Sequence, residues 1–175
     1  MTTHVMIDFE TLDTAISAAV LSVGMVKFDP NGTGIFSEYY AKISIDDQTA
    51  IGRTISDDTI AWWSRQDESV MDEAFSDEGR IPLAQAIDEM HKFMWGQTYF
   101  WSHGSTFDIM IMQNLYDSIG KVYPWQYYNV RDTRTLFSLC NVTIDKANLH
   151  NPLDDAKRQA KAVQDALKIL NVEIK

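Results

Sequence analysis

The chain opens with alternating apolar and polar positions, which is the pattern of half-buried β-strands. Three such segments follow one another, at residues 4–10, 17–28 and 35–45. The second and third are separated by PNGTG at 30–34, whose Asn-Gly step and second glycine favour a turn. We therefore predict that the chain begins with a meander of three strands.

Apolar residues at helical spacing dominate the rest of the chain. Helices are predicted after the N-cap candidate Ser56, from Pro82, after Ser105 or Thr106, over 131–140, and after Asn151 and Pro152. The third of these helices has its expected apolar face at Phe107, Met110, Ile111, Leu115 and Ile119. Short strands are predicted between helices at 98–104 and 125–130. This order predicts an α/β fold with a mixed central sheet of about five strands flanked by helices.

Length and composition fit one globular domain spanning residues 1–175. Hydrophobic residues make up 45% of the chain and aromatic residues 11%, which excludes a disordered protein. The one cysteine, Cys140, cannot form an internal disulfide, and no Cys/His spacing suggests zinc. The apolar run at 15–26 is too short to cross a bilayer and follows acidic residues, so we expect no membrane partner and a cytoplasmic location.

The net charge of −10 disfavours a strong sequence-independent grip on nucleic acid, because that grip comes from Lys and Arg neutralising phosphates. A polyanionic substrate would therefore need metal cations to help hold it.

Asp8 and Glu10 share one face of the first predicted strand and lie about 7 Å apart at strand rise. Two such carboxylates repel each other and resist burial unless a divalent cation lies between them. Two solvated acids at a strand end are an equally good explanation of this pair taken alone.

Two further acids lie near the starts of predicted helices. Asp108 falls in the first turn of the helix after the 98–104 strand, and Asp155 falls in the first turn of the last helix. His150 precedes Asp155 by five residues. Each acid by itself could simply complement the helix dipole.

Taken in order, Asp-x-Glu-Thr, Phe-Asp and His-x4-Asp resemble the motifs of the DEDDh subclass of DnaQ-like 3′-to-5′ exonucleases. The three motifs are DFET at 8–11, HGSTFD at 103–108 and HNPLDDA at 150–156. The resemblance spans residues 6–160 and is greatest to small stand-alone or phage-type members. The tyrosine subclass carries Tyr four residues before the last Asp, where this chain has Asn151, so the histidine subclass fits.

The resemblance implies a single RNase H-like exonuclease domain that releases nucleoside 5′-monophosphates from single-stranded DNA or RNA with a free 3′ end. It implies two divalent cations, Mg²⁺ or Mn²⁺, and His150 as general base. The implied metal ligands are Asp8, Glu10, Asp108 and Asp155, and with His150 they form the implied catalytic set. The positions implied to contact the terminal nucleotide are Thr11, Leu12 and Phe107. Relatives of this kind are often dimers, which makes a homodimer one option, but the sequence does not determine the oligomeric state.

Several alternatives stay open at this point. A haloacid-dehalogenase-type phosphatase would need Asp-x-Asp, but the second acid here is Glu10. A non-catalytic RNase H-like module that binds nucleic acid or protein would tolerate loss of the acids, which are all present. Trp62 and Trp63 could stack on bases or fill the core. No residue distinguishes DNA from RNA.

Overall fold

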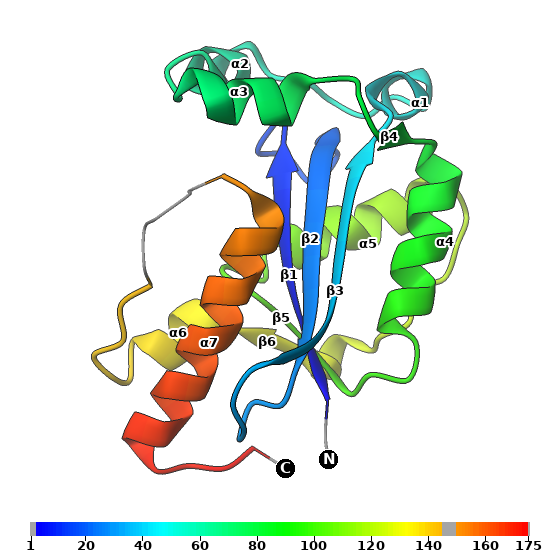
Figure 1. The fold of residues 1–175 in the computed structure, drawn as a ribbon. Helices are drawn as coiled ribbons and strands as arrows, with labels where there is room; N and C mark the ends of the chain where they lie inside the picture. Colours follow the sequence, from blue (N-terminus) through cyan, green and yellow to red (C-terminus); the bar gives the residue numbers. More distant parts are fainter. Residues whose placement is uncertain (1–2, 145–149, 175) are drawn as a thin grey trace.

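A computed structural model describes residues 3–144 and 150–174 of the 175-residue chain. Its centre is a six-stranded mixed sheet in the spatial order β4-β3-β2-β1-β5-β6 (Figure 1). The strands are β1 (His4–Thr11), β2 (Val20–Phe28), β3 (Ile35–Ile43), β4 (Arg80–Ile81), β5 (Tyr99–Ser102) and β6 (Val130–Asp132). Strand β1 pairs antiparallel with β2 and parallel with β5, so it lies inside the sheet. The predicted α/β class and mixed sheet are confirmed.

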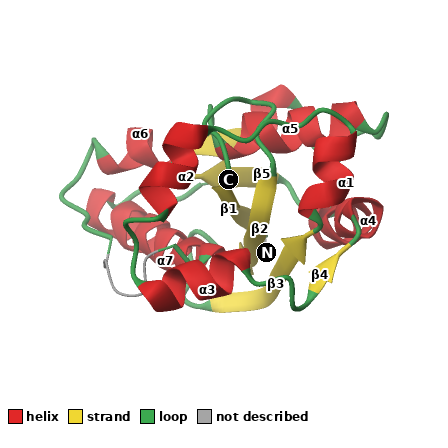
Figure 2. Cartoon of the chain, turned by 90° about the horizontal axis from the view of Figure 1, so that it is seen from above, coloured by secondary structure: helices red, strands yellow, loops and turns green. Residues whose placement is uncertain are grey.

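Helices cover both faces of this sheet and one of its ends. They are α1 (Ile45–Ala50), α2 (Asp57–Trp63), α3 (Glu68–Phe75), α4 (Leu83–Met94), α5 (Asp108–Ser118), α6 (Thr133–Phe137) and α7 (Pro152–Leu170), with a 3₁₀ turn η1 (Tyr127–Asn129). Figures 1 and 2 place α7 on one side of the sheet and α4 and α5 on the other. The short helices α1 to α3 lie across the end at which β1 finishes. None of the described helices has the length and apolarity needed to cross a bilayer.

The alternation in β1 divides its side chains between two hydrophobic clusters. Val5, Ile7 and Phe9 pack in the cluster that includes the apolar faces of α4 and α5. Met6 packs on the opposite face, against α7. Asp8, two residues further along the strand, therefore shares the α7 face, as the period-2 pattern predicted.

The prediction of a strand over 125–130 is wrong for most of that segment. Residues Tyr127–Asn129 form the turn η1, and the strand begins only at Val130. The side chain of Asn129 accepts a hydrogen bond from the Gln126 N–H at 3.1 Å, and this local bonding competes with strand pairing. Strand β4 was not predicted, because two residues carry no readable period. Met110 is exposed rather than part of the apolar face of α5.

Helix α7 begins as the sequence predicted. The side chain of Asn151 accepts hydrogen bonds from the N–H groups of Leu153 and Asp154, both at 3.1 Å, and Pro152 occupies the first turn. This start lies directly on β2. A Cβ placed on Gly24 would come within 2.2 Å of backbone atoms of Pro152 and Leu153. Because Gly24 is the cross-strand partner of Asp8, this close approach brings the first turn of α7 beside Asp8.

We expect Gly24→Ala to lower the free energy of unfolding by about 1 to 3 kcal/mol, the usual cost of overpacking, because the added methyl group meets backbone that cannot rotate away. Chemical denaturation followed by circular dichroism measures this difference. Gly32→Ala is the control, since its methyl group would meet only the Asp29 side chain, at 3.2 Å. Equal stability of Gly24→Ala and the wild type would contradict the close packing described above.

Candidate active site

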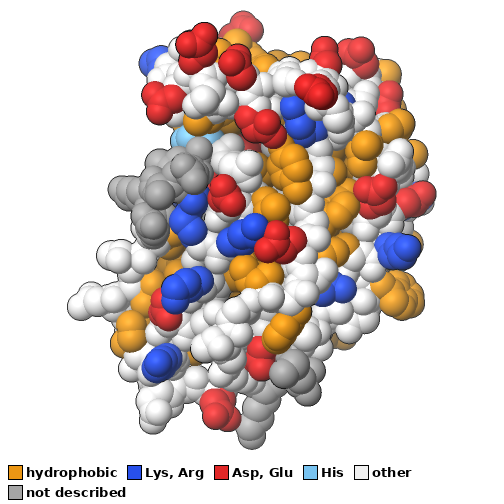
Figure 3. Space-filling view, in the orientation of Figure 1, with side chains coloured by type: hydrophobic (Ala, Val, Ile, Leu, Met, Phe, Trp, Pro, Cys, Tyr) orange, Lys and Arg blue, Asp and Glu red, His pale blue; other side chains and the backbone are white. Residues whose placement is uncertain are grey.

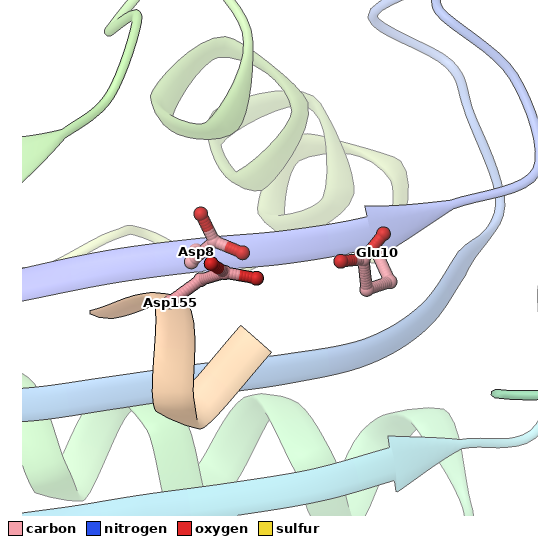
Figure 4. A group of neighbouring side chains, drawn as sticks. All are labelled: Asp8, Glu10 and Asp155. Carbon is pink, nitrogen blue, oxygen red and sulfur yellow. The ribbon is translucent and has the colours of Figure 1, made fainter. Parts of the chain in front are cut away.

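Three carboxylates converge where α7 meets the sheet. Asp8 and Glu10 extend from β1, and Asp155 extends from the first turn of α7 (Figure 4). One oxygen atom from each side chain lies within 4.8 Å of the others. The sequence predicted these three residues as ligands of one ion, and the fold brings them together from opposite ends of the chain.

Asp108 lies behind this group at the start of α5. It is only 5% exposed, and its Oδ1 accepts a hydrogen bond from the backbone N–H of Phe9 at 3.0 Å. This bond joins the start of α5 to β1 between the two acids of that strand. The negative charge of Asp108 acts on Asp8, so all four predicted acids belong to one electrostatic cluster.

Burial raises the pKa of three of these carboxyl groups, those of Asp8, Glu10 and Asp108. Burial raises the pKa of Asp8 well above its usual value, and the charges of Asp108, Glu10 and Asp155 raise it further. The pKa of Glu10 is raised to about 8, mainly by burial and to a lesser extent by the charge of Asp155. Burial raises the pKa of Asp108 to about 7. Such a cluster favours a cation, and clustered carboxylate oxygens suit hard divalent ions such as Mg²⁺ or Mn²⁺.

Two side chains that were not predicted to belong to the metal site contact the acids. Arg158 donates from Nη2 to Oδ1 of Asp155 at 2.5 Å, and Gln159 donates from Nε2 to Oδ1 of Asp8 at 2.7 Å. They follow Asp155 by three and four residues, the spacing that places helix side chains on the same side. Counting three and four residues on from the predicted ligand Asp155 could therefore have identified both side chains from the sequence.

His150 lies beside Glu10 in an unusual backbone conformation, with φ of 70°. Its Nδ1 is 3.8 Å from Oε1 of Glu10, and its ring centroid is 4.9 Å from that of Trp62 in an edge-on contact. Its backbone N–H donates to Oδ2 of Asp155 at 3.0 Å. Burial lowers the pKa of His150, so the imidazole is neutral and able to accept a proton near neutral pH.

A pocket of about 420 Å³ opens next to Glu10, between the end of β1 and α2. Two of the three predicted substrate contacts, Thr11 and Phe107, line it. The third, Leu12, does not line it; its side chain is 2% exposed and packs with Ala19, Leu21, Trp63 and Ala74. The predicted contact of Leu12 with the terminal nucleotide stays a prediction.

The two adjacent tryptophans have different environments. Trp63 is 1% exposed, and its indole N–H donates to the carbonyl of Thr11 at 2.9 Å. Trp62 is 37% exposed and lines the pocket beside His150. Trp63 therefore fills the core, as tryptophans at such positions usually do, whereas Trp62 remains accessible to a ligand.

A larger groove of about 1100 Å³ lies along α7 beside the turn at 30–35, and none of the four acids lines it. Lys157 and Lys161 do line it, and Figure 3 shows Lys and Arg side chains over this part of the molecule. Acidic side chains gather over the end covered by α1 to α3. Lys157 pairs with Glu38 and Lys161 pairs with Asp165, so these charges are partly compensated within the protein.

The chain is similar to known nucleases in sequence. A sequence model described as the 3′-5′ exoribonuclease Rv2179c-like domain matches residues 3–167. An exodeoxyribonuclease of Enterobacteria phage T4 is 30% identical over 155 residues, which cover 74% of this chain and 68% of the phage protein.

The fold is also similar to solved nucleases. The zinc-bound E. coli ExoI–ssDNA complex has a TM-score of 0.72 and 12% identity, and covers 97% of this chain. The nuclease domain of 3′hExo, a DEDDh family member bound to rAMP, has a TM-score of 0.63 and 15% identity, and covers 99% of this chain. This chain spans 41% of the ExoI chain and 94% of the 3′hExo domain. At identities this low, these structural matches establish a shared fold and nothing more.

We expect the metal-free protein to lose stability as the pH rises through about 7 to 8. The pKa of Asp108 is about 7 and that of Glu10 about 8 in the folded protein, above their ordinary values of 3.8 and 4.5. Between these limits the folded state binds more protons than the unfolded state, so raising the pH favours unfolding. Their contribution is complete below about pH 4 and is lost above about pH 8.

Thermal unfolding in EDTA across this pH range measures the effect. Mn²⁺ should raise the melting temperature more at about pH 8 than at about pH 5, because at the lower pH protons compete for the carboxylates. Glu10→Gln should flatten the pH dependence in EDTA. Identical pH dependence in Glu10→Gln and the wild type would contradict the assignment to Glu10.

Proposed function

Because the chain belongs to the Rv2179c-like 3′-5′ exoribonuclease domain family, within the DnaQ-like exonucleases of the DEDDh type, we propose how this 3′-to-5′ exonuclease domain works. Residues 1–175 form one domain that releases nucleoside 5′-monophosphates from the 3′ end of a single strand. It uses two divalent cations, Mg²⁺ or Mn²⁺, with His150 as general base. The observation that carries this proposal is the convergence of Asp8, Glu10 and Asp155 within 4.8 Å.

Each acid has a distinct place in the proposal. Asp8, Glu10 and Asp155 would hold one cation, while Asp8 would also reach the second, with Asp108 behind it. Bound there, the two cations would activate the attacking water and stabilise the oxygen that leaves the phosphodiester. The hydrogen bond from Phe9 to Asp108 fixes the carboxylate that is furthest from solvent.

His150 accepts the proton of the attacking water in this proposal. Its lowered pKa keeps the imidazole neutral, and its position beside Glu10 places it next to the acids. The edge-on contact with Trp62 restricts rotation of the ring. The positive φ of His150 and the hydrogen bond from its N–H to Asp155 tie the base to one of the ligands.

The pocket beside Glu10 would receive the terminal nucleoside. Thr11 and Phe107 line it, and the indole of Trp63 holds the carbonyl of Thr11. Trp62 offers an accessible aromatic face, and stacking on such a face is tolerant of base identity. Leu12 packs in the core with Trp63, so its predicted contact with the terminal nucleotide would be made largely through its backbone.

The proposed substrate is single-stranded DNA or RNA with a free 3′ end. The matching family is described as an exoribonuclease, whereas the phage T4 relative is an exodeoxyribonuclease, and the ExoI structure contains single-stranded DNA. We propose a homodimer as the assembly, following the resemblance to small members of the family. Size-exclusion chromatography with light scattering tests that part.

We expect Asp8→Ala and Asp155→Ala to abolish cleavage, because each removes a proposed metal ligand. The assay follows shortening of 5′-labelled DNA and RNA strands of matched sequence, in Mg²⁺ or Mn²⁺ and then in chelator. Asp154→Ala is the matched control, since Asp154 is adjacent to Asp155 but outside the carboxylate group, and it should retain activity. If the wild type shortens neither strand in either metal, the chain is a non-catalytic module instead.

We expect His150→Ala to slow cleavage by about 10² to 10⁴, the usual range for loss of a general base. The wild-type rate should rise with pH to a plateau, with the midpoint of the rise below the ordinary imidazole pKa, because the pKa of His150 is lowered. Single-turnover rates from about pH 5 to pH 9 measure both effects. A variant as fast as the wild type throughout this range would remove His150 from the mechanism.

A further inference from the structure

Gln159 is a polar residue in the buried stripe of α7. It lies between Ala156, Ala160 and Val163, all fully buried, and is itself only 5% exposed. An amide in such a position costs free energy unless both of its polar ends find partners. Its place one turn beyond Asp155 directs it toward the acids and not toward solvent.

One end of this amide is bonded and the other is not. Nε2 donates to Oδ1 of Asp8 at 2.7 Å. Oε1 is buried and has no hydrogen-bond partner among the described residues. Once Asp8 is ionised, as a metal ligand must be, the reverse orientation would put the amide oxygen against a carboxylate oxygen, so the orientation with Nε2 toward Asp8 is the favourable one.

The unbonded oxygen lies close to Asp8, one of the proposed metal ligands. The oxygen and nitrogen of a planar amide are about 2.3 Å apart, so Oε1 lies within about 5 Å of Oδ1 of Asp8. A buried acceptor this near a metal ligand would be within reach of a water molecule in the coordination shell of a bound ion. Such a water has hydrogen atoms to donate and would satisfy Oε1.

We propose that Gln159 is a positioning residue of the metal site, which holds Asp8 through Nε2 and accepts a hydrogen bond from a cation-bound water through Oε1. This inference rests on the proposed two-cation function. A neutral amide suits the task because it fixes the carboxylate without adding a positive charge that would compete with the ion. Oδ2 of Asp8 then stays available for coordination.

Gln159→Met tests the proposal, because methionine keeps the length and volume of glutamine but removes both hydrogen-bonding groups. Mn²⁺ binding is measured by titration calorimetry and by the electron paramagnetic resonance signal of free Mn²⁺. We expect the dissociation constant to rise by about 10- to 100-fold, the usual effect of losing a partner of a metal ligand. The Mn²⁺ concentration for half-maximal cleavage should rise by the same factor, with a smaller change in rate at saturating metal.

Gln164→Met is the matched control on the same helix. The Gln164 amide donates to the backbone carbonyls of Asp29 and Gly34, at 2.9 and 3.0 Å, and does not contact the acids. Its loss should leave Mn²⁺ affinity unchanged even if the protein becomes less stable. A purely structural role of Gln159 would make the two variants behave alike.

Gln159→Asn provides a second variant if the methionine variant does not fold. It keeps the amide but withdraws it by one methylene group, which breaks the contact with Asp8, so Mn²⁺ affinity should again fall. Wild-type affinity in either folded variant overturns the role of Gln159 while leaving the metal site in place. Absence of Mn²⁺ binding by the wild-type protein would instead overturn the proposed function and this inference together.

Discussion

The close contact between the start of α7 and the sheet at Gly24 is the constraint on which the site depends. Only a residue without a side chain leaves room there, since a Cβ would lie 2.2 Å from the helix backbone. Gly24 pairs with Asp8 across the β1–β2 ladder, so the same contact sets the distance between Asp8 and Asp155. The packing of α7 on the sheet is therefore also what brings Asp155 next to Asp8. On the other side of β1, the hydrogen bond from the Phe9 N–H to Asp108 holds the start of α5, and with it Asp108, beside the same strand.

When ionised and free of metal, the clustered acids destabilise the folded state. Burial and mutual repulsion raise the pKa of Asp8 and Glu10, so at neutral pH the metal-free protein either binds protons or bears uncompensated charge. Cations relieve this repulsion, which couples metal binding to folding stability. The protein compensates part of the charge itself through Arg158 at Asp155, and Gln159 stabilises Asp8 with a hydrogen bond. The overall net charge of −10 makes such compensation more valuable, because few basic side chains are available.

Much of the fold was predictable from local patterns, and the misses have local causes. The period-2 alternation of β1 predicted which face carries Asp8, because a strand enforces that alternation wherever the sheet is packed. The segment at 125–130 has the aromatic and β-branched composition of a strand, yet the capping interaction between Gln126 and Asn129 favours a turn. Trp62 and Trp63 look equivalent in sequence. Only the tertiary environment, including the carbonyl of Thr11, decides that Trp63 is buried and Trp62 is partly exposed.

The sequence by itself determined the identities and order of the four acids and of His150, because motif spacing depends only on covalent connectivity. It also determined the start of α7, since an Asn cap and a first-turn proline act within a few residues. Tertiary structure alone decided that Leu12 is buried and that the start of α7 packs against Gly24. It also decided that Gln159 hydrogen-bonds to Asp8, 151 positions away in the chain. Such contacts join residues with no local relationship, so they exist only after the helix has packed on the sheet.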